Sequence, residues 1–209
     1  MHALSLPTTI ETITKPGNDT LNSSTRNTNL SQYNNDWFKK EIGAGKLKQF
    51  LWYCTNSIFF INSLNFSSGL KIFLLRLFGA KIGNGVVVKP AVNIKYPWKL
   101  IIGDHSWIGE KVWIDNLAQV TIGSNVCLSQ ECFLLTGNHN YKSPTFDLVI
   151  VPIILEDGVW IGAKATVCPG VTCRSHSVLS VGSVATKDLE AFTIYQGNPA
   201  MELRKRVIE

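Results

Sequence analysis

The amino-acid sequence predicts a mainly β solenoid that is built from six-residue steps and preceded by a helical segment. Three segments that begin with Ile-Gly, at Ile82, Ile102 and Ile122, follow one another at intervals of twenty residues. Within and beyond them, aliphatic residues recur at every sixth position. A stretch with helical periodicity comes before the first of these segments.

The chain has 209 residues, which is the length of one globular domain with appendages. Apolar residues make up 45% and charged residues only 17%, so there is enough apolar material to bury a core. Residues 1–36 differ from the rest because they are rich in Ser, Thr and Asn and contain little that packs. We predict that residues 1–36 form a flexible N-terminal tail.

Residues 37–79 are aromatic and aliphatic with scattered lysines, and we predict a helical N-terminal segment here. Gly79 is expected to end the last helix in the left-handed conformation that glycine adopts readily. Two placements of these helices are open: they cap the first coil of the solenoid, or they lie on a membrane surface as a peripheral association. The apolar residues with helical spacing are Leu47, Phe50, Leu51, Leu70, Phe73, Leu74, Leu77 and Phe78.

Residues 80–209 follow the six-residue rhythm. The residue four places after an aliphatic position is usually small or β-branched, as at Val86, Val112 and Ala165. The rhythm is interrupted once, after Leu134, and returns at Leu155. The aliphatic positions are Ile82, Val88, Ile94, Ile102, Ile108, Ile114, Ile122, Leu128 and Leu134, then Leu155, Ile161, Val167, Cys173, Leu179 and Ala185.

A period of six fits neither an α-helix nor a simple two-residue alternation. It fits a triangular solenoid in which each step forms one flat face and one corner, so that three steps complete a coil of eighteen residues. The aliphatic residue then points into the core, the small residue packs beside it, and Gly or Asn occupies the tight corner. The interval of twenty residues adds two residues to such a coil.

The interruption of the rhythm, residues 135–154, is the candidate functional loop. A solenoid core excludes insertions, so the extra residues project outward, and loops on rigid scaffolds commonly carry function. This loop contains His139, one of four histidines in the chain.

The charge and the cysteine content bear on the partners and the cellular location of the protein. The formal net charge of +5 is moderate and does not by itself choose among nucleic acid, an anionic membrane surface and a phosphorylated cofactor. Five cysteines without a CxxC pair favour neither a disulfide framework nor a zinc site, and a reducing cytoplasm is the expected location. No signal-peptide pattern is seen near the N-terminus. We expect no metal and no nucleic-acid partner.

The motifs of residues 74–206 resemble those of the hexapeptide-repeat acyltransferases. They are LLRLFGAKIGNGVVVKP, YPWKLIIGDHSWIGEKVWIDNLAQVTIGSNVCLSQ, LLTGNHNY, VWIGAKATVCPGV and GNPAMELRKR. The chain looks most similar to the branch with the colanic acid biosynthesis, nodulation-factor and galactoside acetyltransferases. The resemblance covers roughly residue 30 to the end, and it implies a left-handed parallel β-helix over residues 80–209.

The resemblance also implies an activity: transfer of an acetyl group from acetyl-CoA to a hydroxyl of a saccharide, in the biosynthesis of an exopolysaccharide or a cell-surface glycan. It makes His139 the general base, because a neutral imidazole can take the hydroxyl proton as the oxygen attacks the thioester. Family members are homotrimers that hold the CoA pantetheine between two subunits. The positions here that match the cofactor site are Trp160, Ala163, Val181, Gly182 and Thr186, with Lys187 and Arg204 placed for the phosphates.

The acceptor side is less defined. Asp115, Asn116, Glu131 or a backbone carbonyl are the candidates to orient His139. Asp115, Asn116, Asn138 and Tyr141 are the candidates to contact the sugar or sugar-conjugate acceptor. The loop has one more residue before its histidine than the galactoside acetyltransferases have, so acceptor contacts do not carry over from them.

Two other functions fit a solenoid of this type. One is a catalytically inert trimeric scaffold or binding module, which would lack affinity for CoA. The other is a metal-dependent carbonic anhydrase of the γ type, which needs three convergent histidines with a close pair among them, whereas His105, His139 and His176 show no such pair.

Overall fold

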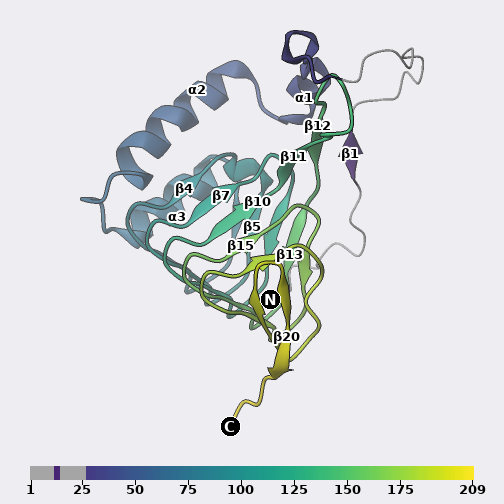
Figure 1. Cartoon of the computed structure of the whole chain (residues 1–209). Coiled ribbons are helices and arrows are strands. Elements are labelled where there is room, and N and C mark those ends of the chain that lie inside the picture. The colour runs from purple at the N-terminus through teal and green to yellow at the C-terminus, as the bar shows by residue number, and fades with distance from the viewer. Residues whose placement is uncertain (1–11, 15–26) are drawn as a thin grey trace.

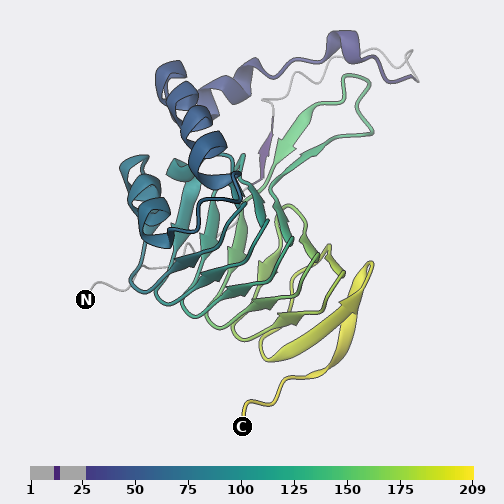
Figure 2. The same cartoon turned by 90° about the vertical axis from the view of Figure 1, so that its left-hand side faces the viewer.

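The computed structural model describes residues 12–14 and 27–209 and shows a parallel β-solenoid with helices at its N-terminal end (Figures 1 and 2). Residues 1–11 and 15–26, most of the predicted tail, lie outside the described residues. Each coil contributes one short strand to each of three parallel sheets, and the chain ends in an antiparallel hairpin at the far end of the solenoid (Figure 2).

The three sheets run along the solenoid in strand orders that advance by one coil at a time. The first contains β2 (Lys81–Ile82), β5 (Leu100–Ile102), β8 (Val120–Ile122), β13 (Ile153–Leu155) and β16 (Thr172–Cys173). The second contains β3 (Val87–Val88), β6 (Trp107–Ile108), β9 (Cys127–Leu128), β14 (Trp160–Ile161), β17 (Val178–Leu179), β19 (Thr193–Gly197) and β20 (Ala200–Lys205). The third contains β4 (Asn93–Ile94), β7 (Trp113–Asp115), β10 (Phe133–Leu135), β15 (Thr166–Val167) and β18 (Val184–Ala185).

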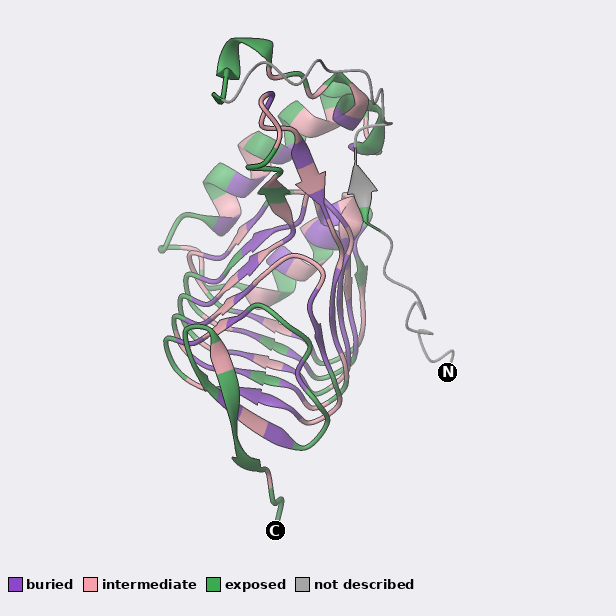
Figure 3. Cartoon of the chain, turned by 45° about the vertical axis from the view of Figure 1, so that its right-hand side comes forward, coloured by how far each residue is buried: buried purple, intermediate pink, exposed green. Residues whose placement is uncertain are grey.

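The strand register confirms the six-residue rhythm. Ile102 pairs with Ile122, which pairs in turn with Leu155 across the inserted loop. Equivalent columns run along the other two sheets, and the aliphatic positions in them are buried from the first coil to the last, apart from the half-buried Ile82. Figure 3 shows the buried residues following the strands of the solenoid. A continuous column of buried aliphatic side chains is therefore what holds successive coils together.

The corners differ from the expectation that Gly or Asn would occupy them. A left-handed residue does stand at each turn between the first and second sheets, and at Gly85 and Asn125 the residue type is the expected one. However, Ala91, Lys111 and Glu131 adopt φ angles of 57° to 60° at the next corner. The ladders on both sides fix the corner geometry, so the repeat tolerates the local cost of a left-handed non-glycine residue.

The early coils have twenty residues instead of eighteen, and the two additional residues lie at the corner between the third and first sheets. Five residues lie between Ile94 and Leu100, and three of them form the short 3₁₀ turn η3 (Pro97–Lys99). The later coil from Leu155 to Cys173 lacks these residues and has the expected length of eighteen. The long insertion leaves the solenoid at this same corner, so the wide corner of the early coils and the candidate functional loop are neighbours.

Helices form where the spacing predicts them: α1 (Asp36–Glu41), α2 (Lys46–Thr55), which continues as the π-helical turn η2 (Asn56–Phe60), and α3 (Ser68–Leu77). The buried face is a different one from the apolar series picked out in the sequence. Trp52, Phe60 and Leu75 enter the core, and the Trp52 indole donates a hydrogen bond to the Ile94 carbonyl at 2.9 Å. Six of the eight residues with helical spacing are instead exposed, namely Leu47, Phe50, Leu51, Leu70, Phe73 and Leu77.

Helix α3 caps the open end of the first coil, as one of the two predicted placements requires, and it packs against β2 and β3. Gly79 ends it with a φ of 100°, which confirms the expected left-handed cap. The Ala80 N–H bonds the Leu75 carbonyl and the Gly79 N–H bonds the Arg76 carbonyl, so the last turn is closed by backbone groups.

Part of the predicted tail is ordered against the insertion. Strand β1 (Ile13–Thr14) pairs with β12 (Leu148–Ile150), and the 3₁₀ turn η1 (Leu30–Gln32) follows a backbone bond from Asn29 to Pro144. Phe38 and Ile42 of the following segment pack with apolar residues of the insertion in a small second core. Tyr33 of the predicted tail packs against this second core, which ties the end of the tail to the insertion. No helix among the described residues is long and apolar enough to cross a membrane.

Candidate active site

The insertion forms an antiparallel hairpin of β11 (Gly137–His139) and β12, which stands out from the corner beside α1 (Figure 1). Its root is tied to the preceding coil by Thr136, whose buried hydroxyl donates to the Asp115 carbonyl at 2.8 Å and accepts the Ala118 N–H at 3.1 Å. At Gly137 a β-carbon would lie 2.6 Å from the Leu117 side chain, so a larger residue would have to displace the end of that side chain. The Thr-Gly pair thus fixes where the hairpin leaves the coil.

His139 is held in one orientation by the return strand of the hairpin. Its Nδ1 lies 2.8 Å from the Phe146 carbonyl oxygen. A carbonyl can only accept, so Nδ1 carries the proton and Nε2 is the unprotonated nitrogen of the neutral ring. The Phe146 ring stacks on the imidazole with centroids 4.3 Å apart and an interplanar angle of 8°, and the Tyr33 ring lies 5.7 Å away.

The backbone conformation of Phe146 lets one residue both accept the hydrogen bond from His139 Nδ1 and stack its ring on the imidazole. Its φ of 51° is in the left-handed region, which turns its carbonyl and its ring toward the same histidine. The turn around it is closed by Asp147, whose carboxylate accepts hydrogen bonds from the hydroxyls of Ser143 and Thr145, each at 2.8 Å. The strained residue is thereby fixed from both sides.

Of the predicted partners for His139, the backbone carbonyl is the one that the structure brings to it. Asp115 forms an ion pair with Lys95 at 3.0 Å, and Glu131 lies within 3.9 Å of the Lys111 and Lys164 ammonium groups. Asn116 is fully buried, accepts the Tyr96 N–H, and donates to the carbonyls of Tyr96 and Lys99. Its amide is used to build the wide corner and does not face solvent.

The other predicted acceptor residues lie on the hairpin or at its root. Asn138 is exposed, and its side-chain oxygen accepts the His139 N–H at 2.8 Å. Tyr141, which follows in the turn, is 75% exposed. Asp115 lies at the hairpin root, where its carbonyl accepts from Thr136. Asn138 and Tyr141 therefore lie on the hairpin with exposed side chains, whereas the buried Asp115 carboxylate is paired with Lys95.

A groove of about 680 Å³ lies at the other end of the solenoid, between the late coils and the C-terminal hairpin of β19 and β20. It brings together Trp160, Ala163, Val181 and Arg204 of the predicted cofactor site. Gly182 follows Val181 with open space around its α-carbon and donates its N–H to the Ala163 carbonyl. Thr186 and Lys187 are exposed and do not line the groove within one chain.

Several groove residues were missed in the sequence. Ser129 and Gln130 come from the coil before Trp160, and the Trp160 indole donates to the Ser129 hydroxyl at 2.9 Å. The repeat register could have found them, because they occupy the same step positions as Gly162 and Ala163. Arg206 also lines the groove, and its guanidinium donates to the carbonyls of Gly158 and His176.

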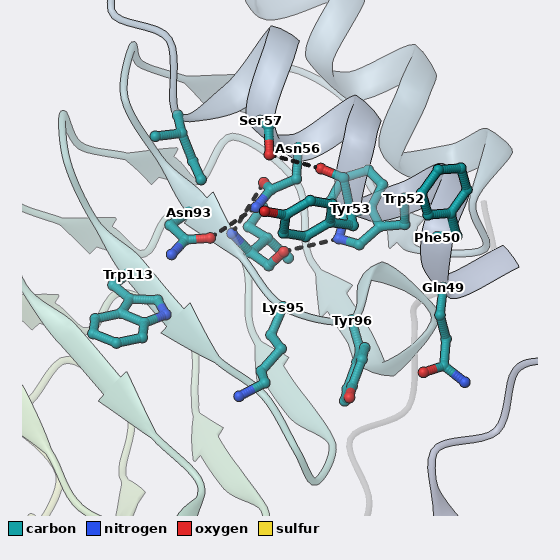
Figure 4. Close-up of a pocket in the computed structure, with 12 residues that line it drawn as sticks. Gln49, Phe50, Trp52, Tyr53, Asn56, Ser57, Asn93, Lys95, Tyr96 and Trp113 are labelled. Atoms are coloured by element: carbon teal, nitrogen blue, oxygen red, sulfur yellow. Dashed lines mark hydrogen bonds between the residues drawn. The ribbon is translucent and has the colours of Figure 1, made fainter. Parts of the chain in front are cut away.

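A second cavity, of about 530 Å³, lies under α2 against the third sheet (Figure 4). Aromatic side chains from both elements line it, among them Tyr53, Tyr96 and Trp113, together with the amides of Gln49 and Asn93. Burial and the neighbouring Asp115 carboxylate raise the pKa of Tyr96. The sequence did not predict this cavity, because it depends on how α2 crosses the sheet.

The cysteines and histidines outside the hairpin have structural surroundings. Burial raises the pKa of the Cys132 thiol to about 12 and that of Cys173 still further, so neither is a ready nucleophile. His105 and His176 stand at equivalent corners, over Gly85 and Gly158 of the preceding coils. Among the described residues, no three His, Cys, Asp or Glu side chains gather as they would to hold a metal ion.

The chain is similar in sequence to known acetyltransferases. The chain is 39% identical over 165 residues to the putative colanic acid biosynthesis acetyltransferase WcaF of Escherichia coli, which covers 79% of this chain and 91% of the relative. It is 30% identical over 135 residues to the galactoside O-acetyltransferase of Escherichia coli, covering 63% and 66% of the two chains. No family model matches the chain.

A solved structure extends the likeness to the fold. A hexapeptide-repeat acetyltransferase from Vibrio cholerae, crystallised with acetyl coenzyme A, superposes with a TM-score of 0.63 over 84% of this chain and 86% of that one, at 26% identity. These likenesses define an acetyltransferase. The chain belongs to the hexapeptide-repeat acetyltransferases, and its fold class is confirmed as a left-handed parallel β-helix with an N-terminal helical segment.

Proposed function

We propose that this enzyme transfers an acetyl group from acetyl-CoA to a hydroxyl of a saccharide, with His139 as the general base. The observation that carries the proposal is the 2.8 Å contact between His139 Nδ1 and the Phe146 carbonyl. It fixes the neutral tautomer in which Nε2 has a free lone pair, and that is the form a base needs before it takes a proton.

The steps follow from this tautomer. Nε2 of His139 removes the proton of the acceptor hydroxyl as the oxygen attacks the thioester carbonyl carbon. The oxyanion that forms needs a hydrogen-bond donor, for which a backbone N–H near the thioester is suited. When the carbon–sulfur bond breaks, the imidazolium can return its proton to the leaving thiolate. The Phe146 carbonyl stabilises the imidazolium through the Nδ1 hydrogen bond.

The groove beside Trp160 is the proposed donor site. It is long and mainly apolar, as pantetheine requires, and Arg204 lies in its lining near the end of β20. The Vibrio cholerae relative crystallised with acetyl coenzyme A supports this assignment. We propose that Trp160, Ala163, Val181 and Gly182 contact the pantetheine and that Arg204 contacts a phosphate. Thr186 and Lys187 would join the site only where a neighbouring subunit extends it.

We also propose a homotrimer with active sites between subunits. His139 does not line the groove within a single chain, since it lies on the hairpin of the third coil while the groove lies on later coils. Side-by-side association of solenoids would bring the hairpin of one subunit to the groove of the next. A closed ring of this kind repeats one heterologous contact.

The proposed acceptor is a saccharide or a sugar conjugate, in the biosynthesis of a cell-surface glycan or an exopolysaccharide. The names of the relatives, which include colanic acid biosynthesis and galactoside acetylation, support the class. Asp115, Asn138 and Tyr141 are the proposed contacts near the reacting hydroxyl. The cavity under α2 offers aromatic faces and amides that suit further sugar units. The cytoplasmic setting expected from the cysteines is part of the same proposal.

The test combines turnover with binding. Acetyl-CoA consumption is measured against a panel of sugars, and the products are identified by mass spectrometry. His139→Ala should lower kcat/KM by about 10²–10⁴-fold, which is the contribution of a positioned general base, while calorimetry shows unchanged affinity for CoA. Full turnover in His139→Ala would refute the base.

The same measurements separate the other functions. An absence of CoA affinity in the wild-type protein would favour an inert scaffold. Hydration of CO₂ that depends on added zinc, without any acetyl transfer, would favour a carbonic anhydrase. Either result would overturn the proposed acetyl transfer.

A further inference from the structure

The outward side of the N-terminal helices is apolar although it faces solvent. Eight large apolar side chains on α2, η2, α3 and the turn between them are exposed and do not line the cavity under α2. Phe66 and Leu64 in the turn are 78% and 76% exposed. We call these residues the helix patch: Leu47, Leu51, Ile58, Leu64, Phe66, Leu70, Phe73 and Leu77.

These helices are apolar on two sides, unlike an ordinary surface helix with one apolar stripe, because Trp52, Phe60 and Leu75 enter the core while the helix patch faces solvent. Two polar side chains are buried beside these apolar ones: Asn56 donates to the Asn93 side chain at 2.8 Å. Lys71 is fully buried, and its ammonium group donates to the carbonyls of Asn65 and Lys89. The core is thus already supplied with apolar and polar side chains from these helices, and the exposed helix patch marks a surface that another apolar phase covers.

The stretch of sequence that contains the patch carries charges of one sign. No Asp or Glu occurs between Glu41 and Asp104, whereas this stretch holds eight Lys and Arg residues. The whole chain carries only +5, so the remainder is net negative. Lys46 and Lys81, at the two ends of the helical segment, are exposed, as is Lys89 in the first coil, whereas Lys95 is paired with Asp115. An apolar surface within a purely cationic stretch matches the chemistry of an anionic bilayer interface.

We propose that the helix patch docks on the surface of a bilayer that contains anionic lipids. The apolar side chains of the patch enter the boundary between headgroups and acyl chains, and the flanking lysines face lipid phosphates. The helices then lie in the plane of the interface. This inference goes beyond acetyl transfer and does not depend on it, because it uses no residue of the hairpin or of the groove.

The alternative occupant is a second copy of the chain. A two-fold contact through the helix patch would bring the same cationic stretch against itself, and like charges at an interface are unfavourable. A bilayer with anionic headgroups supplies both the apolar phase and the opposite charge. The charge distribution therefore favours lipid over self-association.

The test is co-sedimentation of the full chain with phosphatidylcholine vesicles that contain or lack phosphatidylglycerol. The wild-type protein should bind the vesicles with phosphatidylglycerol and bind those without it only weakly. Binding to the anionic vesicles should decrease at high salt, because salt screens the charges. The double variant Phe66→Ser/Phe73→Ser should bind at least tenfold more weakly, since each phenylalanine contributes a large part of the buried apolar area. Lys46→Gln and Lys81→Gln should each weaken binding about fivefold.

The matched control is Val207→Ser, an equally exposed apolar residue in the C-terminal tail, which should bind like the wild type. Circular dichroism verifies the fold of every variant. Wild-type protein that stays in the supernatant with anionic vesicles overturns the proposal. So does a double variant whose mass in sedimentation equilibrium falls to that of a smaller oligomer, because the helix patch would then be a contact between subunits.

Discussion

The hairpin that carries His139 and the groove beside Trp160 are built in different ways. The hairpin depends on contacts that occur once, such as the Thr136 bridge and the left-handed Phe146. The groove is made of step positions that recur from coil to coil, where Gln130, Ala163 and Val181 are equivalents. A unique site should be sensitive to single changes in geometry, whereas a repeated one should be sensitive mainly to changes in volume.

Among changes that leave His139 in place, filling the groove gives the largest expected effect. Ala163→Phe places a ring in a space that the pantetheine is proposed to occupy. The KM for acetyl-CoA should rise at least tenfold with kcat little changed at saturation, because uniform binding is what is lost. Glu110→Phe is the control, since Glu110 is the exposed equivalent in an earlier coil, outside the groove lining. If the two variants have equal KM values, the groove is not the donor site.

The second-largest effect is expected from removing the aromatic ring that stacks on His139. Phe146→Ala keeps the backbone carbonyl but removes the ring that lies 4.3 Å from the imidazole. We expect kcat to fall about tenfold at unchanged KM for acetyl-CoA, because a misoriented base slows only the proton transfer. Phe133→Ala, which removes a ring stacked on Trp113 elsewhere in the coil, should leave kcat near that of the wild type. Equal kcat values in both variants would show that the carbonyl alone positions His139.

The root of the hairpin is tested through stability. Thr136→Val removes the hydroxyl that accepts the Ala118 N–H and leaves that buried donor unpaired. The cost should be about 1–3 kcal/mol, measured as a lower midpoint in chemical denaturation. Thr121→Val is the matched control, because the Thr121 hydroxyl is buried without a hydrogen-bond partner and its loss should be neutral or stabilising. A neutral Thr136→Val would mean that the hydroxyl does not stabilise the root.

The smallest effect concerns the wide corner. Burial lowers the pKa of Lys99 from 10.5 to about 8 in the folded protein. Between these values the unfolded chain holds a proton that the folded chain has lost, so stability rises with pH over this window. In Lys99→Met this rise should be smaller, whereas the exposed Lys46→Met should keep it. Thermal melts at pH 8 and above pH 10 compare the variants, and an unchanged rise in Lys99→Met would assign it to other groups.

The sequence predicted the solenoid well because each coil repeats the same requirement. Ile102, Ile122 and Leu155 are buried for the same reason, so a period could be read without knowing any contact in advance. The helices were predicted in position but not in orientation. Nothing in the spacing of Leu47, Phe50 and Leu51 indicated that Trp52 would face the core instead.

The sequence also predicted the position of the candidate site but not the orientation of its residues. The break in the rhythm located the hairpin and the residue His139, and the resemblance gave its proposed role. Its orientation came only from the fold, since the Phe146 carbonyl is a backbone group whose direction depends on a left-handed φ. Asn116 looked equally suited to a ligand in the sequence, but its burial shows that it holds the wide corner.

By itself, the sequence determined the coil, its period and the place where the period breaks, because these are local and repeated properties of residue type. Only the tertiary structure decided which face of each helix is buried, which atom holds His139, and which coils enclose the groove. Those properties depend on segments distant in the chain meeting at one corner or one end of the solenoid. A pattern along the sequence does not contain that information, since it fixes spacing along one direction and leaves the packing between elements open.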